Sequence, residues 1–109
     1  MKKIILLILC FLLIGCGEAE TDIKKIMEKN EYIVVDVRSA WEYSKSHVVN
    51  SINVPYETID ENTDLDKDKV IFVYCQSGGR SSIAFEILKN LGYTVYDLGA
   101  YESVDLPKE

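Results

Sequence analysis

The 109-residue sequence is short of cysteine and of positive charge: it has three Cys, and 12 Lys or Arg against 18 Asp or Glu. So few cysteines exclude a disulfide-rich scaffold, and a chain of this size buries a core large enough to fold without disulfides or a structural metal. The acidic balance argues against a nucleic-acid-binding surface. Internal repeats, low-complexity tracts and coiled-coil heptads are also absent. These absences predict one small domain with a single compact site.

The sequence also lacks an apolar run long enough to span a bilayer, which takes about 20 residues. Its longest run is Ile4–Ile14, eleven residues that follow Lys2 and Lys3 and stop at Gly15. A positive start followed by a short apolar core is typical of a secretory signal peptide. A transmembrane anchor is the alternative, which the shortness of the run disfavours. We therefore expect residues 1–15 to be a cleaved signal peptide.

The next feature is the tetrapeptide Leu13–Cys16, which resembles the bacterial lipobox. The resemblance implies that Cys16 becomes a lipid-bearing N-terminus, and several acyl chains together give durable membrane attachment. It predicts a lipidated N-terminus with a short linker over residues 16–22 and a folded domain over residues 23–109. We expect this domain to be exported and lipid-anchored to a bacterial membrane, either on the outer face of the cell membrane or in the periplasm or outer membrane.

The cysteines can then be assigned one by one. Cys10 leaves with the signal peptide and Cys16 carries lipid, so the exported domain retains one free thiol, Cys75. A lone thiol in an oxidising compartment is exposed to oxidation and to mixed-disulfide formation. Its presence there indicates a chemical role.

Short apolar runs rich in β-branched and aromatic residues predict buried strands. The two clear candidates are Tyr32–Asp36 and Val70–Tyr74, and the two weaker ones are Ser51–Val54 and Tyr93–Asp97. Helical signals alternate with them. This alternation predicts an α/β fold, with a small parallel β-sheet of four or five strands flanked by helices on both faces.

The helical signals are a capping box and two amphipathic patterns. Ser39 and Glu42 have the spacing of a capping box, which predicts a helix over about residues 40–46. A second helix follows Cys75, opening at about Ser81, because apolar residues recur there at helical spacing up to a stop at Gly92. The apolar positions of an earlier helix are Ile23, Ile26 and Met27. Ligands of parallel sheets bind beyond the carboxyl ends of the strands, which is where Cys75 falls.

The loop after Cys75 combines several features that favour an anion. Gly78 and Gly79 permit positive-φ conformations, which turn backbone N–H groups inward as a nest, and the following helix N-terminus and Arg80 add positive charge. Such surroundings lower a cysteine pKa from about 8.5 to roughly 3.5–7.5. The alternative is that Cys75 is a small buried hydrophobic residue beside a glycine turn. The convergence of features favours a nucleophile held in an anion-binding loop, Gln76, Ser77, Gly78, Gly79, Arg80 and Ser81.

The run Cys75-x-x-Gly78-x-Arg80-Ser81 resembles the active-site loop of single-domain rhodaneses, which are sulfurtransferases. The order and spacing of an N-terminal signature, Val34–Arg38 and then His47-Val48, resemble that family as well, and the similarity is continuous from about residue 31 to residue 101. The departures are Ser46 and Asn50-Ser51 in place of the usual glycines and alanine, and Gly99-Ala100 in place of Gly-Gly.

The resemblance implies that Cys75 is the catalytic nucleophile, assisted by Arg80. Cys75 would take sulfane sulfur from a small anion such as thiosulfate and pass it from a persulfide to cyanide, to a thiol or to an unidentified protein acceptor, with no metal or organic cofactor. Arg80 would attract the anionic donor and stabilise the thiolate, and the hydroxyls of Ser77 and Ser81 would donate further hydrogen bonds. For Asp36, Arg38, Glu42 and His47 the resemblance implies structural roles.

The length of the loop separates this reading from a second enzyme class. Cysteine-dependent phosphatases use a loop with five residues between cysteine and arginine, whereas four separate Cys75 from Arg80. By resemblance, the shorter loop fits a sulfur atom rather than a phosphoryl group, and phosphatase or arsenate reductase activity is the less favoured alternative. A persulfide carrier or docking module that does not turn over remains open as well.

Overall fold

The structure is a computed structural model that describes residues 19–109. The expected signal peptide, Cys10 and the lipobox with Cys16 lie outside the described residues. Within residues 19–109, no helix is both long and apolar enough to cross a bilayer. Two units are distinguished, and the second, Tyr32–Glu109, contains the whole sheet.

Helix α2 (Ala19–Lys29) belongs to the first unit and is described by itself. It confirms the helix predicted from the spacing of Ile23, Ile26 and Met27. These three side chains are half-buried, whereas the charged residues between them are exposed, which is the pattern of an amphipathic helix.

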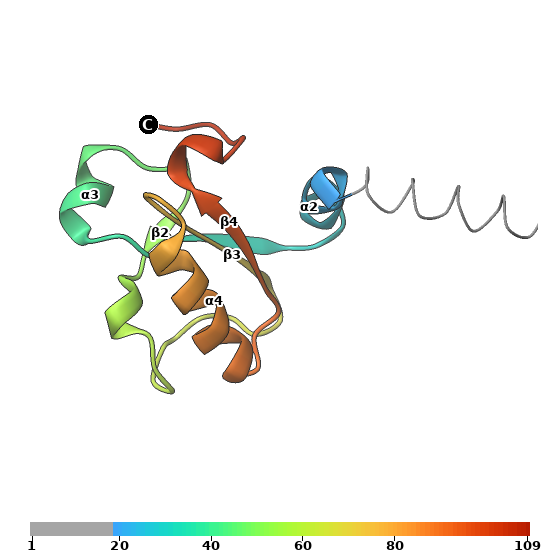
Figure 1. The fold of residues 1–109 in the computed structure, drawn as a ribbon. Coiled ribbons are helices and arrows are strands. Elements are labelled where there is room, and N and C mark those ends of the chain that lie inside the picture. The colour runs from blue at the N-terminus through green and yellow to red at the C-terminus, as the bar shows by residue number, and fades with distance from the viewer. Residues whose placement is uncertain (1–18) are drawn as a thin grey trace, which may run out of the picture. The chain divides into compact units, whose positions relative to one another are not determined.

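Four parallel strands form the sheet in the order β2-β1-β3-β4 (Figure 1). Their bounds are β1 (Tyr32–Asp36), β2 (Ile52–Asn53), β3 (Val70–Cys75) and β4 (Val95–Ala100). The parallel α/β fold predicted from the sequence is therefore confirmed, and the described residues hold four strands of the four or five expected. Because all strands run the same way, their carboxyl ends meet at one edge of the sheet, and Cys75 lies at that edge.

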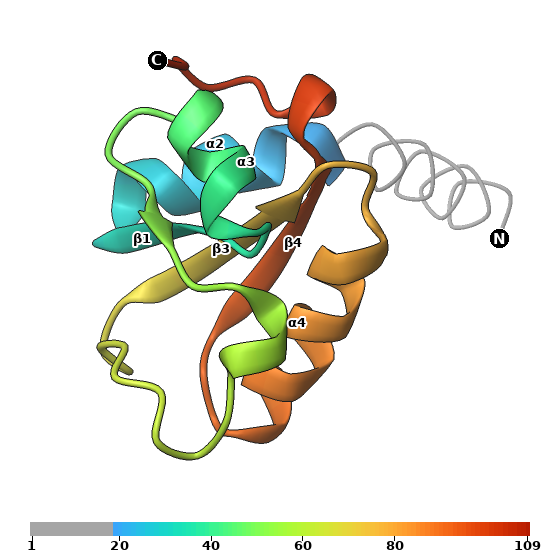
Figure 2. The ribbon, with the colours of Figure 1, turned by 90° about the vertical axis from the view of Figure 1, so that its left-hand side faces the viewer.

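The central strand β3 is buried along its whole length, as the continuous apolar run predicted. Successive side chains point to opposite faces of the sheet. One face packs against α4 (Gly79–Asn90), which runs alongside β3 and β4 in Figure 2. The core members contributed by β3 and α4 are Ile71, Val73, Cys75, Ala84 and Leu88.

The opposite face of the sheet is covered by aromatic rings. The Phe72 ring lies 5.7 Å from the ring of Tyr32 and 5.6 Å from that of Tyr96, measured between centroids. Further along β3, Tyr74 stacks on Tyr101 at 5.7 Å. The first two pairs link neighbouring strands and the third links β3 to the turn after β4, so they stabilise the sheet beyond its backbone hydrogen bonds.

Strand β4 begins later than the predicted range, which started at Tyr93. The Tyr93 amide donates to the carbonyl of Leu88, so this residue still belongs to the turn that ends α4, and its hydroxyl donates to the Thr63 carbonyl. The strand then continues to Ala100 through a bulge, where Gly99 has a φ of 82°. The apolar pattern located the strand but not this turn.

Two helices follow the carboxyl ends of the central strands. Helix α3 (Ala40–Lys45) comes after β1 and has both hydrogen bonds of the predicted capping box; it ends one residue early because Ser46 is extended. Helix α4 comes after β3 and opens at Gly79, with Gly78 as its N-cap, two residues before the predicted start. Two 3-10 turns complete the unit, η1 (Tyr56–Thr58) and η2 (Tyr101–Ser103).

Candidate active site

Cys75 is the last residue of β3, and its side chain is fully buried between the sheet and the first turn of α4. Its sulfur accepts a hydrogen bond from the Gly78 amide at 2.9 Å and lies 3.5 Å from the hydroxyl oxygen of Ser81. Ser81 is also fully buried, and its hydroxyl donates to the Gly78 carbonyl at 3.1 Å. The loop thus wraps around the cysteine sulfur, as predicted.

Of the two loop glycines that permit a positive φ, only Gly78 adopts one. Gly78 has a φ of 101°, a left-handed conformation that directs its amide towards the sulfur. A residue with a Cβ atom pays roughly 1–2 kcal/mol for that conformation. Gly79 does not use this freedom: its φ is not positive, because it is already the first helical residue. Of the two glycines, Gly78 is therefore the one whose conformation shapes the nest.

The environment of the thiol favours its anionic form. Burial raises the pKa of Cys75, but hydrogen bonds to the sulfur from the Ser81 hydroxyl and from the amides of Ser81, Gly78 and Ser77 lower it by more. The net result is a pKa below the ordinary value for cysteine. When the thiol ionises, the Ser81 hydroxyl can turn from the Gly78 carbonyl to the sulfur, because a hydroxyl donor rotates freely.

Replacing Ser81 by Ala tests this account of the thiolate. The variant loses the hydroxyl that donates to the sulfur, so we expect the pKa of Cys75 to rise towards its ordinary value. The rate of alkylation by iodoacetamide, followed against pH, should keep its plateau at high pH and fall several-fold at mildly acidic pH. Ser82→Ala, at the exposed neighbouring position, is the matched control and should leave the profile unchanged. An unshifted profile in the Ser81 variant would show that the backbone amides alone set the pKa.

Arg80 does not contact the Cys75 sulfur directly but forms an ion pair with Glu42 of α3. Its Nη1 and Nη2 atoms donate to the two carboxylate oxygens at 2.6 and 2.9 Å. The side-chain hydrogen bond from Arg80 is the main cause that lowers the pKa of Glu42 to about 2, and the same contact raises the pKa of Arg80. Glu42 also accepts from the amide of Ser39 at 3.1 Å. The pairing of Glu42 with Arg80 was not predicted from the sequence.

Gln76 links the loop to a buried polar network formed by Arg38, Asp36 and Tyr74. Its side-chain oxygen accepts from Nη1 of Arg38 at 3.0 Å, and the Arg38 guanidinium also contacts the Asp36 carboxylate at 2.7 Å and the Ser46 carbonyl at 2.6 Å. The hydroxyl of Tyr74 donates to the same carboxylate at 2.7 Å. Arg38 and Asp36 therefore hold the Gln76 side chain of the loop in place, in keeping with the structural roles expected of them.

His47 lies against other partners. Its ring stacks on Tyr43 at 4.0 Å, Nδ1 is 2.9 Å from the Tyr43 carbonyl, and Nε2 is 3.4 Å from the Glu109 carboxylate. These contacts fit a packing role rather than proton transfer at Cys75.

The remaining residues of the Cys75 loop differ in exposure. Gln76, Ser77 and Gly79 are exposed at the rim of the loop, whereas Gly78 and Arg80 are half-buried.

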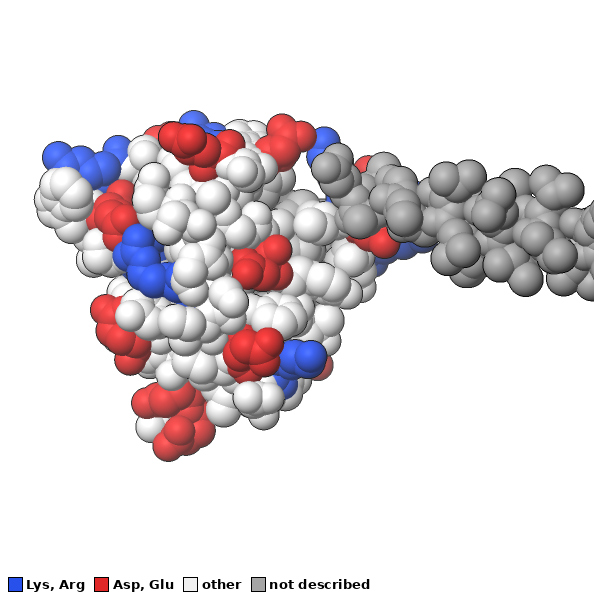
Figure 3. All heavy atoms as spheres, in the orientation of Figure 1, with Lys and Arg blue, Asp and Glu red and all other residues white. Residues whose placement is uncertain are grey.

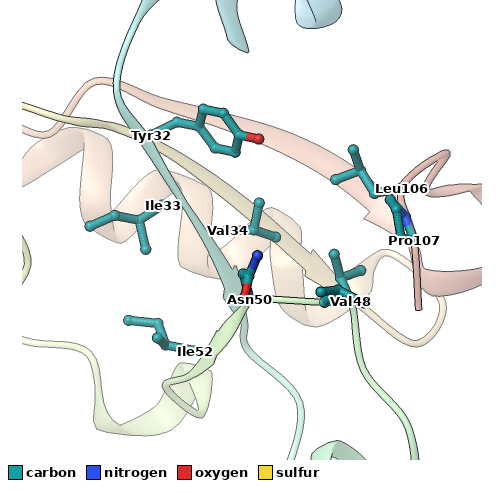
Figure 4. Close-up of a pocket in the computed structure, with 9 residues that line it drawn as sticks. Tyr32, Ile33, Val34, Val48, Asn50, Ile52, Leu106 and Pro107 are labelled. Atoms are coloured by element: carbon teal, nitrogen blue, oxygen red, sulfur yellow. The ribbon is translucent and has the colours of Figure 1, made fainter. Parts of the chain in front are cut away.

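A hollow of about 600 Å³ lies on the sheet away from the cysteine loop (Figure 4). The figure shows Tyr32, Val34 and Val48 lining it together with Leu106 and Pro107. No residue of the Cys75 loop lines it. The described residues also contain no cluster of three or more His, Cys, Asp or Glu suited to a metal ion.

The family model for the rhodanese-like domain matches residues 19–104. The chain belongs to the rhodanese family. Its resemblance to the thiosulfate sulfurtransferase PspE of Escherichia coli K12 amounts to 36% identity over 78 residues, covering 68% of this chain and 75% of that protein. A tRNA sulfurtransferase of Thermoplasma acidophilum is 38% identical over 64 residues, which cover 59% of this chain but only 13% of that relative.

Solved rhodanese structures agree with the fold. A rhodanese with anions from Escherichia coli has a TM-score of 0.64 at 32% identity, covering 72% of this chain and 96% of that one. A rhodanese-related protein of Thermoplasma volcanium has a TM-score of 0.66 at 29% identity, covering 82% and 92%. The segment matched by the family model includes the Cys75 loop.

Proposed function

We propose that the protein is a sulfurtransferase that moves sulfane sulfur from a donor such as thiosulfate to a thiophilic acceptor through a persulfide on Cys75. The observation that carries the proposal is the set of polar groups around the buried sulfur. The Gly78 amide donates to it at 2.9 Å, and the Ser81 hydroxyl oxygen lies 3.5 Å away, where it can donate once the thiol has ionised. These groups lower the pKa of the thiol. A thiolate held in this way is an activated nucleophile.

The reaction has two stages. In the first, the Cys75 thiolate attacks the outer sulfur of thiosulfate; a new S–S bond forms, the donor S–S bond breaks, and sulfite leaves with its electron pair. In the second, a nucleophile such as cyanide or a thiolate attacks the terminal sulfur of the persulfide and restores the Cys75 thiolate. The inward amides of the loop supply hydrogen bonds to the negative sulfur in both stages.

The shortness of the loop and the engagement of its arginine suit it to a sulfur atom rather than to a phosphoryl group. Four residues separate Cys75 from Arg80, and the guanidinium of Arg80 pairs with Glu42 instead of closing over a bound group. A phosphoryl group in a phosphatase loop needs an arginine that grips its oxygens. The engagement of Arg80 elsewhere favours sulfur transfer over phosphate chemistry.

The purified domain, incubated with thiosulfate and cyanide, is expected to form thiocyanate continuously. Incubation with thiosulfate alone should add the mass of one sulfur atom to the peptide that contains Cys75. A mass adduct without continuous thiocyanate formation would support a persulfide carrier instead of an enzyme. Hydrolysis of an aryl phosphate, with neither sulfur product, would reject the proposal in favour of a phosphatase.

A further inference from the structure

The arginine of the cysteine loop is already bound to an anion. Both terminal nitrogens of Arg80 donate to the Glu42 carboxylate, at 2.6 and 2.9 Å. This two-point geometry is the one that a guanidinium offers to a planar or tetrahedral oxyanion. An anionic sulfur donor that approaches Cys75 therefore meets an arginine whose charge and best donors are occupied.

Glu42 is fixed in this position by more than one contact. Its carboxylate also accepts from the amide of Ser39 at 3.1 Å and from the Ser39 hydroxyl at 3.0 Å, as part of the capping box of α3. Because the hydrogen bond from Arg80 lowers the pKa of Glu42 to about 2, the carboxylate stays ionised throughout the neutral range. Both partners of the ion pair are therefore charged at neutral pH.

The second arginine near the loop, Arg38, does not supply a free positive charge for an anionic donor either. Arg38 is buried, with 3% of its surface exposed, and its guanidinium pairs with Asp36. Acidic side chains are also scattered over the face shown in Figure 3, and the whole chain carries a net charge of −6. Such a field slows the approach of a dianion and has little effect on a donor of low charge.

We propose that Glu42 is a specificity-determining residue that disfavours dianionic donors, so that the protein takes sulfur more efficiently from low-molecular-weight alkyl hydropersulfides than from thiosulfate. This inference rests on the sulfurtransferase function proposed above. In the reaction, the Cys75 thiolate attacks the terminal sulfur of R–S–SH. The S–S bond of the donor breaks, Cys75–S–SH forms, and the thiolate R–S⁻ leaves with the electron pair, so no external oxidant or reductant is needed.

The test is the Glu42→Gln variant, because glutamine removes the charge but is accepted at this position of a capping box. Single-turnover formation of the Cys75 persulfide is followed by mass spectrometry. Two donors are compared, thiosulfate and 2-hydroxyethyl hydropersulfide, whose alkyl group carries no charge. We expect the second-order rate constant of the wild type to be higher with the hydropersulfide. In Glu42→Gln the constant for thiosulfate should rise by roughly 5- to 20-fold, since an unpaired cation then faces the donor. The constant for the hydropersulfide should change by less than about two-fold.

Two control variants separate charge from structure. Asp68→Asn removes an equal charge from an exposed position just before β3, at the opposite end of the strand from Cys75, and should change neither constant by more than about two-fold. Ser39→Ala weakens the α3 cap but keeps the Glu42 charge, and should not reproduce the gain with thiosulfate. As a further readout, the thiosulfate constant of the wild type should increase with ionic strength, because salt screens repulsion between like charges, and less steeply in Glu42→Gln.

Three results would overturn the inference. One is a folded Glu42→Gln variant whose thiosulfate constant is unchanged, or falls together with the hydropersulfide constant, which would reduce Glu42 to a structural support for Arg80. Another is an equal rise of the thiosulfate rate constant in Ser39→Ala, which would mean that greater mobility of the loop, and not the charge of Glu42, causes the effect. The third is a wild type that reacts faster with thiosulfate than with the hydropersulfide. Absence of persulfide with either donor in the wild type would instead refute the sulfurtransferase function itself.

Discussion

Substitution of Cys75 by Ser is expected to abolish thiocyanate formation while leaving the fold intact. The hydroxyl is nearly the size of the thiol, so the buried position between β3 and α4 stays filled and little stability is lost. However, the serine hydroxyl does not ionise near neutral pH and cannot hold a transferable sulfur atom. We expect the rate to fall below about one-thousandth of the wild-type value, since removal of a covalent nucleophile leaves only binding.

The measurement is thiocyanate production from thiosulfate and cyanide, paired with the mass of the peptide that contains residue 75. Circular dichroism and the urea midpoint establish that the variant is folded. Ser77→Ala, in the exposed rim of the same loop, is the matched control; it keeps the backbone amide that faces the sulfur and should retain most of the activity. Residual turnover by a folded Cys75→Ser protein, above that of the reagents alone, would place the chemistry at another residue.

The cysteine loop could be predicted from the sequence because its determinants are local. Cys75, Gly78 and Ser81 lie within seven consecutive positions, and each contributes through its own backbone or side chain to one sulfur atom. A strand that ends in a cysteine and a helix that begins a few residues later leave the chain few ways to connect them. The same locality explains why the capping box of α3 was predicted correctly, because Ser39 and Glu42 meet within one helical turn.

The contacts between distant segments could not be predicted in the same way. Glu42 and Arg80 are 38 residues apart, and the sequence already explained Glu42 locally, as the N3 residue of the capping box. Its second partner depends on how α3 and the start of α4 meet at one edge of the sheet, which hydrophobic periodicity does not specify. The predicted start of β4 was wrong for a related reason. Tyr93 has the residue type of a strand, but its hydroxyl donates to the Thr63 carbonyl, and this distant contact holds Tyr93 in the turn before the strand.

Substitution of Asp36 by Ala is expected to cost about 3–5 kcal/mol of unfolding free energy, because it leaves a buried arginine without its counter-ion. The Asp36 carboxylate is fully buried and accepts from the Arg38 guanidinium at 2.7 Å and from the Tyr74 hydroxyl at 2.7 Å. Burial is the main cause that raises the pKa of Tyr74 to about 12, so this hydroxyl remains a donor at neutral pH. A domain of this size has a total stability on the order of 5–15 kcal/mol, so the loss is a large share of it.

Urea denaturation followed by circular dichroism measures this loss, and a partner substitution shows where it arises. If the cost comes from the uncompensated charge, Asp36→Ala combined with Arg38→Met should be more stable than Asp36→Ala alone, because an apolar side chain replaces the stranded guanidinium. The double variant also loses the hydrogen bond from Arg38 to Gln76, so the loop should become more mobile and sulfur transfer slower even where stability returns. If Asp36→Ala alone has the same urea midpoint as the wild type, water or another group must satisfy the Arg38 guanidinium. The network would then contribute to the position of the Cys75 loop rather than to the stability of the fold.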